Sequence, residues 1–205
     1  MANSNSQGFG LVAAARVGNT PAISGQSKYE IDAGSSSAIY NGEIVKVNIS
    51  ASTGGYIVTA AAGTAAVGVL NGVFYTDATT KKPTFANYYA GGITPANSED
   101  ITAFVNDDPN QSYIIATDAT LGATLALRKS KIGLTYATTA AAGDTANGKS
   151  TIRLGISTAA TTAKQLRMMR IAEDVENQDQ TAANCSVVVK INLHQYTVGS
   201  LATGI

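Results

Sequence analysis

The sequence contains no tryptophan, one cysteine, one histidine and four prolines in 205 residues. The single cysteine, Cys185, cannot form an internal disulfide, which suits synthesis in a reducing cytoplasm. The single histidine, His194, has no cysteine or carboxylate beside it at metal-ligand spacing, which argues against a zinc site. The chain therefore offers little material for a metal centre or for a histidine-based active site.

Charged side chains are also scarce, at 14% of the chain, and they sum to a formal net charge of zero. Average proteins carry about 25% charged residues. Nucleic-acid binding needs a positive electrostatic footprint, so we expect no nucleic-acid partner. No run of about 18 apolar residues is present, and we expect no membrane span. The first ten residues lack the basic segment and apolar run of a secretory signal.

Residues with small side chains are abundant in this sequence. Alanine, threonine, glycine and serine together account for 94 of the 205 residues. Such side chains fill thin barrels and closely packed interfaces, but they offer few reactive groups. This composition favours a protein that acts by presenting a surface.

Short β-branched and aromatic runs, separated by turn residues, predict an all-β protein built as an antiparallel barrel or sandwich. The expected strands are Tyr40–Val47, Tyr56–Thr59, Val67–Tyr75, Thr84–Tyr89, Ile101–Val105, Tyr113–Ala116, Leu121–Leu127 and Ser186–Tyr196. Tight turns are predicted at Asn41-Gly42, Asn71-Gly72, Asn147-Gly148 and Asp107–Asn110.

Two segments share a pattern that suggests an internal duplication. Tyr56–Gly63 is YIVTAAAG and Tyr136–Gly143 is YATTAAAG, which agree at six of eight positions. At the same offset, NGEIVKVN (Asn41–Asn48) aligns with LGATLALR (Leu121–Arg128). We therefore predict two related β units, over residues 41–75 and 121–175.

The second unit contains a segment that the sequence leaves open between helix and strand. Residues 159–177 are rich in helix formers, which by propensity alone favours a helix. The duplication instead predicts a strand at Leu166–Ile171. The segment at 140–162 has no counterpart in the first unit, and we expect a loop or an added hairpin there.

One motif suggests nucleotide chemistry. Gly143–Ser150 is GDTANGKS and fits G-x-x-x-x-G-K-[ST], a loop that holds phosphates with backbone N–H groups and a lysine. That loop needs a buried strand before it and a helix after it. The flanking residues are TYATTAAA and the β-branched, glycine-containing TIRLGISTAATT, which predict neither. We interpret the motif as a surface turn and expect no nucleotide cofactor.

Two further groups of side chains resemble parts of reactive or metal-binding sites. Cys185 and His194 could pair as nucleophile and base, but they flank one short strand with odd spacing and would point to opposite faces. An acidic group lacks the ligand spacing and glycine of a calcium loop; it consists of Glu173, Asp174, Glu176 and Asp179. The sequence predicts no enzyme, no catalytic residue, no metal and no cofactor.

The polar start of the chain predicts a flexible N-terminal arm at residues 1–10, ahead of a β domain at residues 11–205. Phe9 is its only large apolar side chain. An arm of this kind can become ordered when it binds a partner. The candidate binding residues of the arm are Gln7, Gly8, Phe9 and Gly10.

Several segments resemble known phage proteins. Three resemble the small β-barrel unit of capsid decoration (cement) proteins of tailed bacteriophages: GEIVKV (Gly42–Val47), YIVTAA (Tyr56–Ala61) and VGVLNGVFY (Val67–Tyr75). Three more resemble short proteins of marine podophages: QGFGLVAAARVG (Gln7–Gly18), AFVNDDPNQSYIIAT (Ala103–Thr117) and KINLHQY (Lys190–Tyr196).

The resemblance implies a structural protein of the virion that is made in the host cytoplasm and binds the outer capsid surface. Its implied partner is the lattice of the major capsid protein, and a homo-oligomer is expected, with a trimer as the usual form. No catalytic residues come with the resemblance. The alternative is a tail, fibre-base or adhesin β module of the virion.

Overall fold

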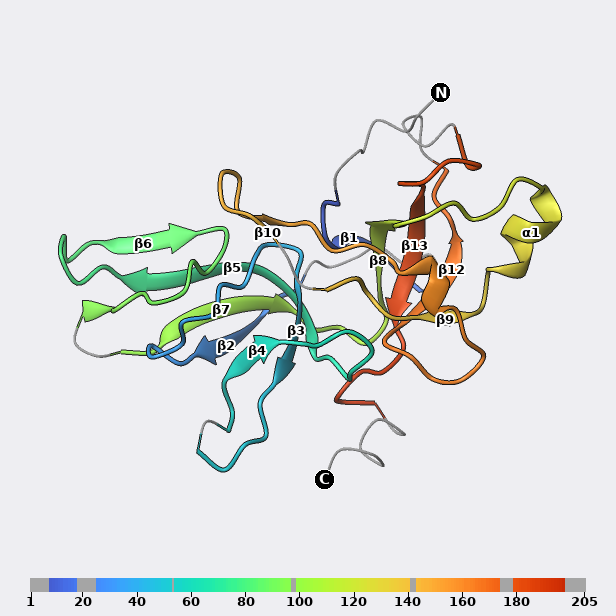
Figure 1. Ribbon diagram of the computed structural model, residues 1–205. Coiled ribbons are helices and arrows are strands. Elements are labelled where there is room, and N and C mark those ends of the chain that lie inside the picture. Colours follow the sequence, from blue (N-terminus) through green and yellow to red (C-terminus); the bar gives the residue numbers. More distant parts are fainter. Residues whose placement is uncertain are drawn as a thin grey trace.

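The chain folds into two antiparallel β-sheets that lie side by side along the long axis of the molecule (Figure 1). The structure is a computed structural model and describes residues 8–17, 25–52, 54–96, 99–140, 143–173 and 179–197. The all-β antiparallel class predicted from the sequence is confirmed.

Sheet I occupies one half of the molecule, on the left in Figure 1. Its strand order is β2-β7-β5-β3-β4, and β6 adds to the far part of β5. The edge strands β2 and β4 approach each other, so the sheet curls toward a barrel. Its strands are β2 (Ser27–Ile31), β3 (Ile44–Val47), β4 (Ile57–Thr59), β5 (Gly68–Thr76), β6 (Pro83–Ala86) and β7 (Ile101–Asn106).

Sheet II forms the other half, with the order β1-β8-β13-β12-β9. Its strands are β1 (Val12–Arg16), β8 (Gln111–Ala116), β9 (Thr135–Tyr136), β12 (Leu166–Ile171) and β13 (Ser186–Ile191). The remaining elements are the helix α1 (Leu125–Ser130), the hairpin of β10 (Gly143–Asp144) and β11 (Lys149–Ser150), and a 3-10 turn at Ile156–Thr158. No helix in the described ranges is long and apolar enough to cross a membrane.

The two sheets share one long β-ribbon. The consecutive strands β1 and β2 pair with β8 and β7, which are also consecutive. Val12 lies opposite Ile114 in sheet II, and Ser27 lies opposite Val105 in sheet I. Because these strand pairs supply β1 and β8 to sheet II and β2 and β7 to sheet I, neither sheet has a complete set of strands without the ribbon.

Two hydrophobic cores follow from this arrangement. One fills the concave side of sheet I and contains Val45, Leu70 and Val105. The other lies between the sheets, since it joins Ile44 of β3 to Tyr113 of β8 and other residues of sheet II. The neighbours Ile44 and Val45 point to different cores, which explains why β3 is apolar at successive positions.

The structure corrects two local predictions. The expected strand Leu121–Leu127 is wrong, because Leu125–Ser130 forms α1. Thr124 caps this helix through its side chain, which accepts a hydrogen bond from the Leu127 N–H at 3.3 Å. The expected turn at Asn71-Gly72 is also wrong, because both residues lie within β5, where the register shifts by a bulge between Leu70 and Gly72.

The structure does not confirm the internal duplication. The segment that should mirror β3 contains α1, and the two matching tyrosines occupy different surroundings. Tyr56 is half-buried, and its hydroxyl donates to Asp100 at 2.9 Å. Tyr136 is fully buried between the sheets and donates to the Lys131 carbonyl. Leu166–Ile171 is nevertheless a strand, as the repeat predicted, so the helix favoured by propensity is wrong.

Candidate functional site

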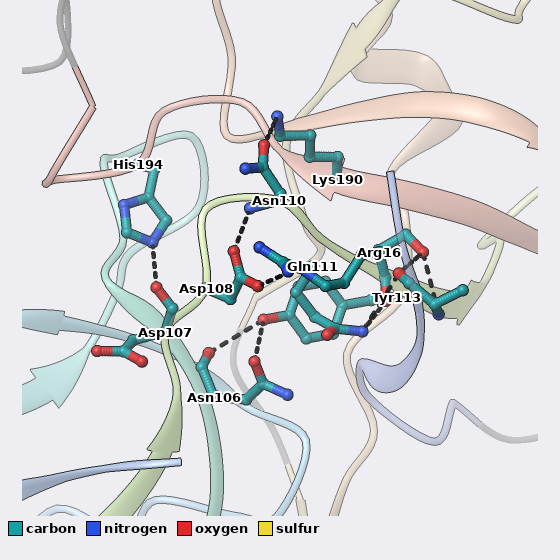
Figure 2. A network of polar contacts seen from close by, with 11 residues as sticks. Arg16, Asn106, Asp107, Asp108, Asn110, Gln111, Tyr113, Lys190 and His194 are labelled. Carbon is teal, nitrogen blue, oxygen red and sulfur yellow. Dashed lines mark hydrogen bonds and ion pairs between the residues drawn. The ribbon is translucent and has the colours of Figure 1, made fainter. Parts of the chain in front are cut away.

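Polar side chains gather where the shared ribbon bends from sheet I into sheet II (Figure 2). The bend is the turn Asp107–Asn110 between β7 and β8, which confirms the turn predicted there. Asn110 donates its backbone N–H to the Asp108 carboxylate at 2.8 Å, and Gln111 donates to the Asp108 carbonyl at 3.0 Å. We call the residues around this turn the joint.

The carboxylate of Asp107 holds the joint to sheet I. Its two oxygens accept hydrogen bonds from Ser27 at 2.9 Å and from the Tyr29 hydroxyl at 2.8 Å, both side chains of β2. Burial, followed by the hydrogen bonds to Tyr196 and Asp107, raises the pKa of Tyr29 far above its ordinary value. Tyr29 therefore stays protonated and acts as a donor to Asp107.

His194 ties the segment after β13 to the same turn. Its Nδ1 accepts the Tyr196 N–H at 3.2 Å, so the proton belongs on Nε2, which lies 3.1 Å from the Asp107 carbonyl oxygen. The ring is buried, and burial lowers the pKa of His194 below its ordinary value. Both ring nitrogens are thus engaged in a neutral imidazole.

Charged side chains close the joint on the side of sheet II. Arg16 at the end of β1 forms an ion pair with Asp108, with 2.7 Å between Nε and Oδ2. Lys190 of β13 donates to the Asn110 side chain at 3.2 Å. Both contacts are partly exposed, and each is worth at most about 1 kcal/mol.

A buried tyrosine links the two strands on either side of the turn. The Tyr113 hydroxyl of β8 donates to the Asn106 carbonyl at the end of β7, at 3.0 Å. Tyr113 is 1% exposed, and burial raises its pKa above the ordinary value. Because donor and acceptor are both buried, the loss of this bond would be costly, and the bond ties the end of β7 to β8 across the bend.

A hollow of about 470 Å³ lies beside the joint, lined by Ser27, Asp107, Asp108, Gln111 and Tyr196 among others. The carboxylates that face it already accept the hydrogen bonds and the ion pair described above. Tyr29 and His194 are held as a protonated phenol and a neutral ring. The geometry of these groups supports a structural role, that of fixing one sheet against the other.

The described part of the predicted arm lies against the body of the protein. Gln7 falls outside the described residues. A Cβ on Gly8 would overlap the Thr151 carbonyl, and one on Gly10 would come within 2.7 Å of the Gly42 carbonyl oxygen. Phe9, between them, is half-buried. Gly8–Gly10 is therefore packed on the segment after β11 and on the turn before β3.

The phosphate-loop motif forms a hairpin, as the predicted surface turn requires. Gly143 and Asp144 pair with Ser150 and Lys149, and Gly148 has a φ of 70°. The chain after Ser150 continues without a helix to the 3-10 turn at Ile156–Thr158. The backbone therefore does not form the strand, loop and helix on which phosphate binding by this motif depends.

The motif's glycines have a packing role instead. Tyr40 and Tyr88 stack with ring centroids 5.4 Å apart and planes 3° apart. A Cβ on Gly143 would overlap the Tyr40 ring, and one on Gly148 would lie 2.5 Å from Tyr88 Cδ1. The hairpin backbone thus lies on the stacked pair, and both glycines are needed for this close approach.

The other candidate groups are not assembled into a site. Cys185 precedes β13 and His194 follows it, so the two lie at opposite ends of that strand. Among the residues that the structure describes, no three His, Cys, Asp or Glu side chains group as metal ligands. Asp174 and Glu176 of the acidic group fall outside the described residues; Glu173 is exposed, and Asp179 accepts hydrogen bonds from Thr181.

No protein family, curated protein or solved structure matches this chain. The joint was missed in the sequence because its partners are far apart. Ser27 and Asp107 are 80 positions apart, and His194 is 87 positions from Asp107. The only local signal is the Asp-Asp-Pro-Asn sequence, which predicts a turn. It does not predict the hydrogen bonds and the ion pair that hold this turn to the two sheets.

Proposed function

We propose that the protein is a structural component of a phage virion that binds and stabilises the outer surface of the capsid. The observation that carries the proposal is the resemblance of three segments to the barrel unit of decoration proteins. In this chain those segments form the consecutive strands β3, β4 and β5, which pair as one antiparallel unit within the curled sheet I.

The polar groups give this proposal further support. The joint uses Asp107, Asp108 and His194 to hold two sheets in one body, and Tyr113 is bonded across the bend. A rigid body with fixed surfaces is what a protein needs to bridge neighbouring subunits of a shell. Affinity would then come from many weak contacts made at once.

The test is binding to bare, expanded capsid shells. Intact protein is mixed with shells and sedimented, and the bound fraction is compared with that of a variant lacking residues 2–7. This deletion ends before Gly8, so it keeps the packing of Gly8 and Gly10 against Thr151 and Gly42. We expect saturable binding of the intact protein at a fixed number of copies per shell, and weaker binding of the truncated protein.

Each outcome separates the alternatives. Equal binding by both forms would remove the arm from the proposal and place the contact on the β body. Failure of the intact protein to bind shells would overturn the decoration function and favour the tail or adhesin module. Shells with bound protein should also withstand heating better than bare shells, because ligand binding stabilises the assembled state.

A further inference from the structure

The zero net charge hides a strong segregation of charge along the chain. Residues 121–171 contain a single acidic side chain, Asp144, and eight basic ones: Arg128, Lys129, Lys131, Lys149, Arg153, Lys164, Arg167 and Arg170. The rest of the chain therefore carries a matching excess of negative charge. In the fold, residues 121–171 supply α1, β9 and β12 at one end of the molecule (Figure 1).

The apolar side chains of the helix at this end are largely exposed. No residue of α1 is buried, and Leu125 and Leu127 are 56% and 52% exposed. Ile132, just after the helix, is 39% exposed. Lys129 stands among these side chains and is exposed as well. Exposed apolar groups gathered on a projecting element mark an interaction surface.

Strand β12 adds to this surface. Gly133 donates to the Met168 carbonyl at 2.9 Å, so the chain after α1 runs beside β12. The neighbouring side chains Arg167, Met169 and Arg170 are exposed. In the described part of the chain, none of the basic residues of α1 or β12 forms an ion pair. We call α1, Ile132 and these three residues of β12 the basic end.

The opposite end of the molecule carries an apolar surface of its own. Phe74 of β5 lies opposite Phe85 of β6 on one side and Thr102 of β7 on the other. The Phe85 ring lies 5.8 Å from that of Phe104, and Phe85 is 63% exposed. Three of the chain's four phenylalanines thus form one outward surface, which we call the phenylalanine face.

Carboxylates border the phenylalanine face. Glu30 lies opposite Thr102 and so continues the row of Phe85 and Phe74. Asp32 and Asp100 follow at the adjoining ends of β2 and β7, next to Glu99. The hydrogen bond to Asp100 and the charge of Asp100, followed by desolvation and then by the charges of Asp32 and Glu30, raise the pKa of Tyr56. Basic side chains are present as well: Lys28 lies opposite Phe104 in the next row, and Lys81 and Lys82 are exposed on the turn between β5 and β6.

We propose that the basic end of one copy docks on the phenylalanine face of a second copy, with Lys129 toward the Glu30 side. The two surfaces match in both respects: each has exposed apolar side chains, and their charges are opposite. One copy cannot cover both, because they lie at opposite ends of the molecule (Figure 1). A contact between two different surfaces is head-to-tail and closes into a ring when its rotation allows, as in a trimer.

This inference deepens the homo-oligomer of the proposed function, and it is tested on purified protein without shells. A purified protein that does not self-associate would therefore contradict this inference without contradicting the proposed binding to capsid shells. The measurement is sedimentation equilibrium over a range of concentrations. We expect the intact protein to associate, and Leu127→Ser and Phe85→Ser each to raise the dissociation constant by at least about tenfold, which is a 1.4 kcal/mol effect.

Mixing the two variants tests the head-to-tail geometry. Each variant keeps one intact surface, so the mixture should form a one-to-one dimer that grows no further and is at least about tenfold tighter than the association of either variant alone. A contact made by the same surface on both copies would give no such rescue. An intact protein that remains monomeric up to about 100 µM, well above the concentration at which micromolar complexes form, would overturn the proposal.

Charge exchange provides a second test that is insensitive to folding defects. Lys129→Glu and Glu30→Lys should each weaken association about tenfold, and the double variant should recover it. Lys149→Glu is the matched control, because Lys149 is exposed on the β10–β11 hairpin and belongs to neither surface. Association unchanged by both single substitutions, or weakened equally by the control, would contradict the proposed contact.

Discussion

Gly143 lies directly against the ring of Tyr40, and no Cβ could be added to it without overlapping that ring. The ring cannot easily turn away, because it is stacked on Tyr88. The first glycine of an apparent phosphate loop is therefore required by the packing of a hairpin on two aromatic rings.

Gly143→Ala should destabilise the protein by about 1–3 kcal/mol, the usual cost of adding atoms to a well-packed site. The free energy of unfolding is measured by denaturant titration. Gly34→Ala is the matched control, because a Cβ there meets Asp32 only at an ordinary 3.5 Å. The control should change stability by less than about 0.5 kcal/mol, and an equally small effect at Gly143 would contradict this packing role.

Lys149→Ala should leave stability within about 0.5 kcal/mol of the original protein, since Lys149 is exposed. The protein should show no change in melting temperature with ATP and magnesium, because the hairpin provides no helix N-terminus for a phosphate. An ATP-dependent shift that disappears in Lys149→Ala would show that the motif binds nucleotide after all.

Glu43 should make stability fall as pH rises. It is 1% exposed, and burial raises its pKa from 4.5 to about 7, against a smaller lowering by the Tyr40 backbone N–H. Because the folded pKa exceeds the unfolded one, this contribution is fully favourable below about pH 4.5 and is lost as pH rises toward 7. The total change is about 3 kcal/mol.

Glu43→Gln removes this titration. Relative to the original protein, its free energy of unfolding should therefore increase between about pH 4.5 and pH 7 and stay level above pH 8. Glu99→Gln, at an exposed carboxylate, serves as the control for removing one carboxylate from the chain. Parallel profiles for Glu43→Gln and the original protein would mean that Glu43 does not titrate in this range.

Tyr113→Phe should cost about 1–2 kcal/mol, because it leaves the buried Asn106 carbonyl without the hydroxyl that bonds it across the bend. Tyr88→Phe is the control, since it keeps the ring that stacks on Tyr40 and removes a hydroxyl for which the described residues provide no partner. Thermal unfolding of both variants measures the difference. If the two variants have the same melting temperature, the Tyr113 hydrogen bond does not stabilise the joint.

The sequence predicted most strands of the barrel-like sheet, because β3, β5 and β7 carry strong runs of β-branched residues. It did not predict β1, where three of five residues are alanine, or β2, where charged and apolar residues alternate weakly. The segment of helix α1 was predicted as a strand, and the apparent repeat supported this by aligning Leu121–Arg128 with the segment that forms β3. The exposed helix is better explained by propensity and the Thr124 cap.

The joint was not predictable from a single sequence. Asp107 and Asp108 indicate a turn, but their binding partners come from three separate elements. The segregation of charge is visible in the sequence once residues 121–171 are counted separately, but the opposite surface combines β2, β5, β6 and β7. Its composition becomes apparent only when these strands are placed side by side.

The late position of β13 in the chain has a consequence for how the protein can fold during synthesis. Sheet II cannot acquire its central strand until residues 186–191 have been made, and Gln195 bonds to Val47, 148 positions earlier. Contacts between such distant positions slow folding, because closing the long loop between them costs conformational entropy before the contact stabilises the fold. The strands of sheet II that pair with β13 therefore stay unpaired on the nascent chain for most of translation. Such unpaired strand edges expose the chain to aggregation until β13 has been made.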